Sequence, residues 1–230
     1  FKDGSRVINL QEEYTCVQLS MPSSFFCIEV VKNINFDKTL KIAEDAKEII
    51  KILLQKRMLG TVVSGNYLYR RRTLGESSAI QNSEKNYNWY IPYLKFFVED
   101  ICKYSIQKLG YIPYFVQYSL MYDLQWKLKQ EKLPAGILSP TEKDMYYRLM
   151  FQLISKFDDK IILEQKNLPI EYKAFLLRKK YQKFPESIYC DEDISLYFDN
   201  TYVTSFSKHK FVIDFITLEE ELLTIEGYGV

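Results

Sequence analysis

The chain is poor in the residues that hold zinc or build disulfide frameworks. Its 230 residues include a single histidine, His209, and four cysteines, Cys16, Cys27, Cys102 and Cys190. No two of the cysteines form a Cys-x-x-Cys pair, so their spacing argues against a zinc site. No nucleophile pattern accompanies the histidine. We therefore expect reduced thiols, mostly in apolar surroundings, as is typical of a reducing compartment.

The chain also lacks a charge excess and a long apolar run. It carries 31 basic and 30 acidic residues, which gives a net charge of +1. A strongly basic nucleic-acid-binding domain would show a larger excess, so contact with nucleic acid would need a local patch. No stretch approaches the ~18 apolar residues of a membrane-spanning helix, and the polar start at 1–4 differs from a signal peptide. These absences predict an intracellular, cytoplasmic protein without a membrane partner.

Glycine is scarce, at 8 residues, whereas tyrosine contributes 19 and phenylalanine 15. With 47% hydrophobic residues, the chain can build a full core, since a chain of this size buries roughly 70% of its unfolded surface. The pattern predicts a mixed α+β fold without internal repeats. We place an N-terminal hairpin and helical region of unknown role at 1–136 and a second domain at 137–230. The boundary follows the Leu-Pro-Ala-Gly stretch at 133–136.

Periodicity assigns the elements of the N-terminal part. Residues 14–19 and 25–31 are rich in β-branched and aromatic types, and turn residues at 21–24 separate them, so we expect a hairpin. Asp37 is the expected N-cap of the first helix. Apolar residues at helical spacing predict three helices, and a strand follows the first of them: helices at 40–58, 90–109 and 115–129, and a strand at 61–70.

The C-terminal part begins with a clear helix start. Ser139 is the expected N-cap, Pro140 stands in the first turn and Glu142 occupies the third position, as in a capping box. This helix should run to about Lys156. The apolar and basic runs that follow predict the remaining elements: a short strand at 160–165, a helix at 169–183 and a closing hairpin at 210–228.

Two carboxylates stand near the ends of the two apolar runs of the closing hairpin. Asp214 lies in the first run and Glu226 in the second, so two antiparallel strands would bring both side chains towards one edge of a sheet, depending on register. Magnesium prefers hard oxygen ligands and retains several waters, so one or two carboxylates suffice. We therefore expect Mg²⁺ or Mn²⁺ at Asp214 and Glu226.

The motif order after residue 137 resembles the restriction-endonuclease-like family, usually written PD-(D/E)xK. The matching segments are a Ser-Pro-Thr-Glu helix start, a strand with Gln, a Val-Ile-Asp-Phe strand and an Ile-Glu-Gly strand end: 139–142, 161–165, 212–215 and 225–229. The resemblance implies an α/β/α core and metal-dependent phosphodiester hydrolysis, in which the metal lowers the pKa of a water. It implies Asp214, Glu226 and Glu142 as catalytic residues, with Glu142 acting through water.

The chain departs from that family in two places. Two positions after Glu226 stands Tyr228, where members carry a lysine that steadies the attacking water. The chain stops at Val230, where members continue with a further strand and helix, so we expect a truncated domain. Either Lys166 or Lys210 replaces the missing lysine, or the site has lost catalysis, or Asp214 and Glu226 are ordinary carboxylates at strand ends.

Clustered basic residues suggest a nucleic-acid partner. Arginine binds phosphate groups bidentately, and stacking aromatics beside basic residues are typical of single-strand binding. Solvated surface is the alternative interpretation of such runs. Two clusters are the expected contacts to DNA or RNA: Arg70, Arg71 and Arg72, and then Arg178, Lys179 and Lys180.

Other assignments stay open. The order of an arginine strand at 69–72, a Ser/Thr strand at 204–207 and a glutamate turn at 219–221 is similar to ADP-ribosyltransferases. The aromatic clusters at 87–93 and 111–118 predict helix packing or an interface with a protein partner. The leading hypothesis is a nuclease-like, nucleic-acid-associated protein, active or degenerate. The alternatives are a non-enzymatic interaction subunit of a larger assembly and an ADP-ribosyltransferase-like enzyme.

Overall fold

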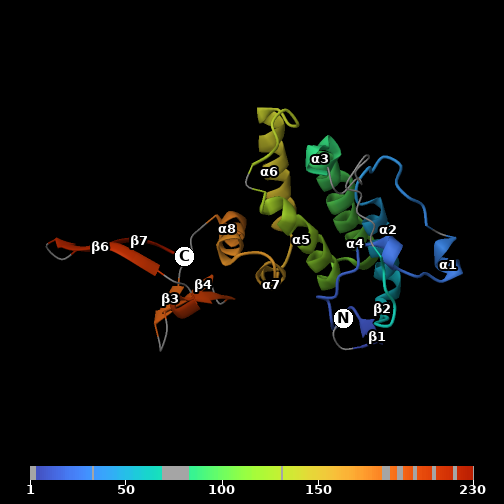
Figure 1. Ribbon diagram of the computed structural model, residues 1–230, viewed down its shortest axis with the longest axis horizontal. Helices are drawn as coiled ribbons and strands as arrows, with labels where there is room; N and C mark the ends of the chain where they lie inside the picture. The colour runs from blue at the N-terminus through green and yellow to red at the C-terminus, as the bar shows by residue number, and fades with distance from the viewer. Residues whose placement is uncertain are drawn as a thin grey trace. The chain divides into compact units, whose positions relative to one another are not determined.

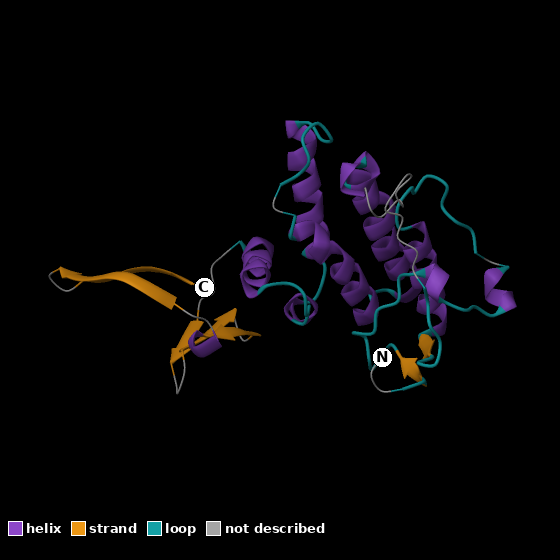
Figure 2. Cartoon of the chain, in the orientation of Figure 1, coloured by secondary structure: helices purple, strands orange, loops and turns teal. Residues whose placement is uncertain are grey.

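The computed structural model divides the chain into two compact units, unit 1 (Phe1–Leu168) and unit 2 (Pro169–Val230). Helices and antiparallel strands both occur, so the predicted α+β class is confirmed (Figures 1 and 2). The residues that the structure describes are 4–32, 34–68, 83–130, 132–182, 187–190, 194–198, 201–208, 211–219 and 222–229.

Unit 1 is mainly helical. Its helices are α1 (Ile28–Val31), α2 (Glu44–Lys56), α3 (Ile91–Tyr93), α4 (Asp100–Leu109), α5 (Tyr114–Leu128), α6 (Pro140–Ile154) and α7 (Asp159–Leu163). Short helical turns are η1 (Met21–Ser23), η2 (Ser83–Lys85) and η3 (Tyr87–Trp89), and a π-helical segment, η4 (Leu94–Glu99), joins α3 to α4. Two strands, β1 (Arg6–Asn9) and β2 (Met58–Thr61), pair antiparallel.

The helix predicted at 90–109 is confirmed as the continuous run of α3, η4 and α4. Its apolar face is fully buried, with Phe97 and Ile101 at 0% exposure. Gly110 ends the run with a φ of 81°, a left-handed conformation that glycine adopts without the steric penalty of a Cβ. Pro113 then starts α5 as its N-cap residue. Most of α5 is buried, and it forms the centre of unit 1.

Along the sequence, the boundary between the two units lies after Leu168, whereas the predicted boundary lies at 136/137. The reason is α6, which packs against α3 and η4. Its Tyr146 is fully buried, and the ring centroid lies 5.3 Å from that of Tyr90 in an edge-on arrangement. The Pro- and Gly-containing segment that suggested a linker is therefore a turn inside unit 1.

The hairpin predicted at 14–31 is wrong. The chain forms η1 and α1 there, with an irregular segment before them. Gln18 accepts a hydrogen bond from the Ser20 backbone N–H at 3.0 Å and donates to the Ser24 hydroxyl at 2.8 Å. Such side-chain bonds give the backbone an alternative to a strand ladder.

Two further local assignments are corrected. The strand predicted at 160–165 is α7, because Asp158 caps it by accepting from the Lys160 backbone N–H at 3.0 Å. The strand predicted at 61–70 is wrong over its described part: β2 spans Met58–Thr61 and pairs with β1, residues 62–68 form no strand, and 69–70 lie outside the described residues. Asp37 does not cap α2. Its carboxylate instead accepts from the Thr39 backbone N–H at 3.0 Å.

The described residues of unit 2 form one α-helix and two small antiparallel sheets. The helix predicted at 169–183 is confirmed as α8 (Ile170–Tyr181). The strands β3 (Ser187–Cys190), β4 (Ile194–Phe198) and β5 (Thr201–Ser205) form one sheet, and a turn, η5 (Phe206–Lys208), follows. The predicted closing hairpin is confirmed as β6 (Phe211–Glu219) and β7 (Leu222–Gly229).

In the part of the chain that the structure describes, no helix has both the length and the apolar character to cross a membrane.

Candidate functional site

The carboxylates proposed as metal ligands lie on the β6–β7 hairpin. Glu226 pairs with Phe215, while Asp214 falls at a bulge between Ile213 and Phe215. Both carboxylate residues are exposed. Within the described ranges, no group of three or more His, Cys, Asp or Glu residues could hold a metal ion. A site for Mg²⁺ or Mn²⁺ at Asp214 and Glu226 therefore stays a prediction from the sequence.

Glu142, the third proposed catalytic residue, belongs to unit 1 and serves as a helix cap. The predicted capping box is confirmed: Glu142 accepts from the Ser139 backbone N–H at 2.9 Å, and its own N–H donates to the Ser139 hydroxyl at 3.3 Å. The hydrogen bonds from the backbone and hydroxyl of Ser139 lower the pKa of the Glu142 carboxyl. This geometry gives Glu142 a structural role at the start of α6.

The structure describes one of the two basic clusters. Arg70, Arg71 and Arg72 lie outside the described residues. The second cluster, at 178–180, forms the last turn of α8. Cations there interact favourably with the negative end of the helix dipole, and Lys179 also lies 5.6 Å from the ring centroid of Phe175. The position of this cluster therefore has a structural explanation within its own helix.

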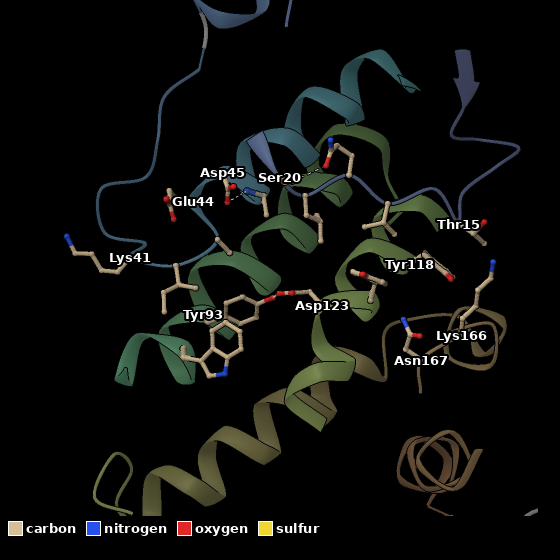
Figure 3. Close-up of a pocket in the computed structure, with 18 residues that line it drawn as sticks. Thr15, Ser20, Lys41, Glu44, Asp45, Tyr93, Tyr118, Asp123, Lys166 and Asn167 are labelled. Carbon is tan, nitrogen blue, oxygen red and sulfur yellow. Dashed lines mark hydrogen bonds between the residues drawn. The ribbon is translucent and has the colours of Figure 1, made fainter. Parts of the chain in front are cut away.

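A pocket of about 820 Å³ lies within unit 1, and we call it the aromatic pocket (Figure 3). It is bordered by the irregular segment before η1, the start of α2, the η3–α3 region, α5 and the turn after α7. Its lining residues are Thr15, Val17, Gln18, Leu19, Ser20, Lys41, Ile42, Ala43, Glu44, Asp45, Ala46, Trp89, Tyr93, Tyr118, Tyr122, Asp123, Lys166 and Asn167.

One wall of the aromatic pocket consists of packed rings. The Trp89 and Tyr93 ring centroids are 6.0 Å apart. Tyr93 is fully buried, and its hydroxyl donates a hydrogen bond to the carboxylate of Asp123. Burial and the neighbouring Asp123 charge together raise the pKa of Tyr93 well above its ordinary value. The hydroxyl is therefore a permanent donor, which fixes the Asp123 carboxylate at the pocket wall.

A buried lysine supports this wall from behind. Lys127, one turn after Asp123 on α5, is 2% exposed and is not a lining residue. Its ammonium donates to the Trp89 carbonyl at 2.7 Å. It also lies 3.1 Å from the Trp89 ring centroid and 3.9 Å from that of Tyr93. Burial lowers the pKa of Lys127 well below its ordinary value, although the Asp123 carboxylate opposes this shift.

The opposite side of the pocket is polar and includes the start of α2. Asp45 accepts a long hydrogen bond, 3.4 Å, from the Met21 backbone N–H and so connects α2 to η1. Ala43 adopts a φ of 68°, a conformation that carries strain for a residue with a Cβ. Lys166 and Asn167 complete the rim from the turn after α7.

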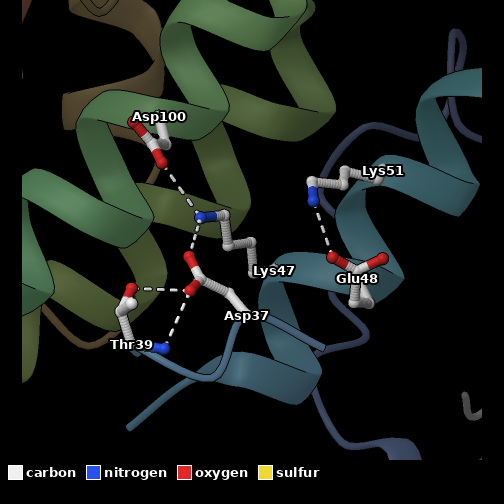
Figure 4. Close-up of polar contacts among 6 residues, drawn as sticks. All are labelled: Asp37, Thr39, Lys47, Glu48, Lys51 and Asp100. Atoms are coloured by element: carbon white, nitrogen blue, oxygen red, sulfur yellow. Dashed lines mark hydrogen bonds and ion pairs between the residues drawn. The ribbon is translucent and has the colours of Figure 1, made fainter. Parts of the chain in front are cut away.

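A second polar network holds α2 in position (Figure 4). Lys47 is 4% exposed, and its ammonium lies 2.8 Å from a carboxylate oxygen of Asp37 and 3.0 Å from one of Asp100. The first carboxylate precedes α2 and the second begins α4. The network therefore fastens α2 to its neighbours directly beside the pocket residue Ala46.

The aromatic clusters at 87–93 and 111–118 are recognisable from the sequence, although their pattern predicts packing or a partner interface. Asp123 and Lys127 are not predicted from the sequence. Their signal is present in α5, because two opposite charges at i and i+4 interrupt a helix whose other faces are largely apolar, and lysine is almost never buried without a partner.

The chain is similar to two curated proteins. It is 32% identical over 232 residues to the minor teichoic acid biosynthesis protein GgaB of Bacillus subtilis (strain 168), a match that covers 98% of this chain and 25% of GgaB. It is 25% identical over 183 residues to the minor teichoic acid biosynthesis protein GgaA of the same organism, covering 76% of this chain and 40% of GgaA. The chain thus spans well under half the length of these relatives. No family model and no solved structure matches it.

These similarities correct the functional prediction. The nuclease hypothesis, with its nucleic-acid-binding and hydrolase descriptions, is wrong, because the two relatives, matched along 98% and 76% of the chain, are both named for teichoic acid biosynthesis. The two alternative functions are replaced for the same reason. The restriction-endonuclease-like resemblance rests on four short motifs, and a carboxylate at a strand end is a common surface feature with low specificity.

Proposed function

We propose that this chain takes part in the biosynthesis of a cell-wall glycopolymer of the teichoic acid type. The observation that carries the proposal is the end-to-end match: 98% of the chain aligns with GgaB at 32% identity. A second match, to GgaA, covers 76% of the chain. Because the chain corresponds to 25% of GgaB, its role is that of one region of a larger biosynthetic protein.

The structure offers a site suited to such a role. Enzymes and binding regions of glycopolymer synthesis must hold polyhydroxylated ligands, and the aromatic pocket combines rings with hydrogen-bonding side chains. We place the chain inside the cell. This location agrees with Cys16, Cys27 and Cys102, which are all present as thiols, since thiols persist in reducing compartments.

The proposal is tested in the organism that carries the chain. An in-frame deletion of these residues should lower the phosphate and sugar released from purified cell walls, and a plasmid copy of the intact gene should restore both. Immunoblotting confirms that the shortened protein is still made. Unchanged wall phosphate and sugar in the deletion strain would contradict the proposal.

A chimera provides an independent check. The segment of GgaB that aligns with this chain is replaced by the chain itself in Bacillus subtilis. We expect the chimera to retain more of the minor teichoic acid than a strain in which the same segment is deleted. Equal polymer content in these two strains, with both proteins present at equal levels, would count against a shared role.

A further inference from the structure

We infer that the aromatic pocket of unit 1 binds a neutral sugar ring, as one glycosyl unit of a polymer or of its precursor. The assignment of that ring to a wall glycopolymer rests on the proposed function. The binding itself is argued from the pocket. Its volume, about 820 Å³, lies in the range of ligand sites, roughly 300–1,000 Å³, and exceeds what one pyranose ring fills.

The aromatic wall suits the apolar face of a sugar. A pyranose carries C–H groups on its two faces and hydroxyls around its edge, so an aromatic ring can stack on a face while polar groups bind the edge. Trp89 is half-buried and lines the pocket. One face of its ring is covered by Lys127, whose ammonium lies 3.1 Å from the centroid. Lys127 does not line the pocket, so we place the ligand on the other face of the Trp89 ring.

The wall is fixed before any ligand arrives. Lys127 holds the backbone of Trp89 through the 2.7 Å bond to its carbonyl, and the hydroxyl of buried Tyr93 holds Asp123. A ring that is already immobilised loses little side-chain entropy on binding, which favours affinity. The buried lysine therefore acts as a positioning residue for the aromatic wall.

Asp123 and Asn167 offer partners for the hydroxyl edge. An ionised carboxylate has about four acceptor sites, and Tyr93 occupies one of those of Asp123. The remaining acceptors can receive sugar O–H groups in charge-assisted hydrogen bonds. Asn167, which also lines the pocket (Figure 3), carries both a donor and an acceptor. This mixture matches hydroxyls, which donate and accept at once.

The charges select against a phosphorylated ligand. Among the lining residues, the carboxylates of Glu44, Asp45 and Asp123 outnumber the ammonium groups of Lys41 and Lys166. A diphosphate entering such a pocket would meet more negative than positive charge, and like charges repel. The balance favours a neutral glycosyl unit over a nucleotide sugar.

The chain offers a built-in reporter for this binding. It contains two tryptophans, Trp89 in the pocket and Trp126 on the exposed side of α5. The full 230-residue chain with Trp126→Phe therefore fluoresces from Trp89 alone. The ligands to test are methyl glycosides of common hexoses and N-acetylhexosamines, and neutral oligosaccharides released from cell walls. We expect at least one of them to shift this fluorescence saturably, with a Kd on the order of 1 mM or tighter.

Paired variants test the geometry. Asp123→Asn and Asn167→Ala should each weaken binding of that sugar at least fivefold, whereas Asp144→Asn, a matched change on the exposed face of α6, should leave it unchanged. Tyr122→Leu should weaken it similarly, with Tyr111→Leu outside the pocket as its control. Thermal unfolding followed by circular dichroism identifies a variant that fails to fold. If another variant fails to fold, Asn167→Ala tests the inference, because Asn167 lies in a turn where truncating its side chain should not disturb the fold.

Three results would overturn the inference. One is the absence of any saturable change with every neutral sugar and oligosaccharide. Another is a nucleotide sugar that binds more than tenfold tighter than the methyl glycoside of the same sugar, which would indicate an anion site. The third is unchanged binding in both Asp123→Asn and Asn167→Ala. If the wall polymer depends on the chain but the chain binds no sugar, this inference alone is refuted. If the chain binds sugar but its deletion leaves the wall polymer unchanged, the proposed function is refuted.

Discussion

Replacing Lys47 by methionine should destabilise unit 1 strongly, because it removes a cation that binds two carboxylates in the α2 network. The Lys47 side chain is 6% exposed, and the Asp37 and Asp100 oxygens lie 2.8 and 3.0 Å from its ammonium. Methionine retains most of the aliphatic stem, so little cavity forms. The effect therefore measures the loss of the charge rather than the loss of packing.

The size of this destabilisation depends on how far water reaches the carboxylates of Asp37 and Asp100. Removing one member of a fully buried ion pair costs about 3–5 kcal/mol, because the other charge stays buried without compensation. Here the Asp37 side chain is 25% exposed and that of Asp100 is 43% exposed, so both carboxylates recover part of their hydration. We expect Lys47→Met to lower the free energy of unfolding by about 2 kcal/mol at pH 7.

The same contact predicts a pH dependence. The hydrogen bond from Lys47, followed by that from Thr39, lowers the pKa of Asp37 in the folded chain. Its contribution is therefore present above the unfolded pKa of about 3.9 and is lost as pH falls towards the folded value. Burial opposes the charge of Lys47, but hydrogen bonds to Asp37 and Asp100 outweigh it and raise the Lys47 pKa. That contribution is present below about pH 10.4 and is lost only in stronger alkali.

Urea unfolding followed by tryptophan fluorescence measures these effects in unit 1, since both tryptophans belong to it. The difference between wild type and Lys47→Met should be largest between pH 5 and pH 9 and should shrink as pH approaches 2. Lys103→Met removes an exposed ion pair to Glu99 and should change stability by less than about 0.5 kcal/mol. A difference for Lys47→Met that is equal at pH 2 and pH 7, or no larger than the control, would refute the reasoning.

Three further predictions concern single positions. Gly110→Ala should cost about 1 kcal/mol in urea unfolding, because alanine is strained at a φ of 81° although its Cβ meets no neighbour; an unchanged midpoint would show that the helix end relaxes. Ser139→Ala should also cost about 1 kcal/mol through the lost cap of α6, and a loss that Ser139→Asp does not rescue would contradict capping. In thiol labelling read by mass spectrometry, exposed Cys27 should react quickly. Cys102, buried and with its pKa raised to about 11 by burial, should react only on unfolding, and equal rates would disprove the placement.

Elements whose structure depends on residues that are close together in the chain could be predicted from the sequence. The capping box at Ser139, the stop at Gly110 and the closing hairpin at 210–228 all depend on residues a few positions apart, and the structure confirms them. The prediction failed at 14–31, where local side-chain hydrogen bonds compete with a strand. It also failed at 160–165, where a cap on a three-residue apolar run decides between helix and strand.

Long-range pairing was beyond such reasoning. Strand β1 pairs with β2 across more than fifty positions, as the hydrogen bond from the Arg6 backbone N–H to the Thr61 hydroxyl illustrates. Periodicity alone cannot choose that partner. The boundary between the units differs from the predicted one for a related reason, because α6 packs against α3 and η4, which lie far upstream. A Pro-Gly stretch signals a turn but does not say whether the chain returns to the same core.

The aromatic pocket shows why function was misread. Its walls come from segments that are distant in the sequence, so no spacing rule identifies it, whereas strand-end carboxylates match a short motif by chance. The informative sign was Lys127. Burying an ammonium group costs several kcal/mol, and an apolar residue of similar length would often stabilise the fold equally well or better. A lysine kept at 2% exposure is therefore poorly explained by stability, and its contacts with Trp89 connect it to the wall of the pocket. In this chain a residue that breaks a rule of core composition marks the candidate site better than residues that complete a familiar motif.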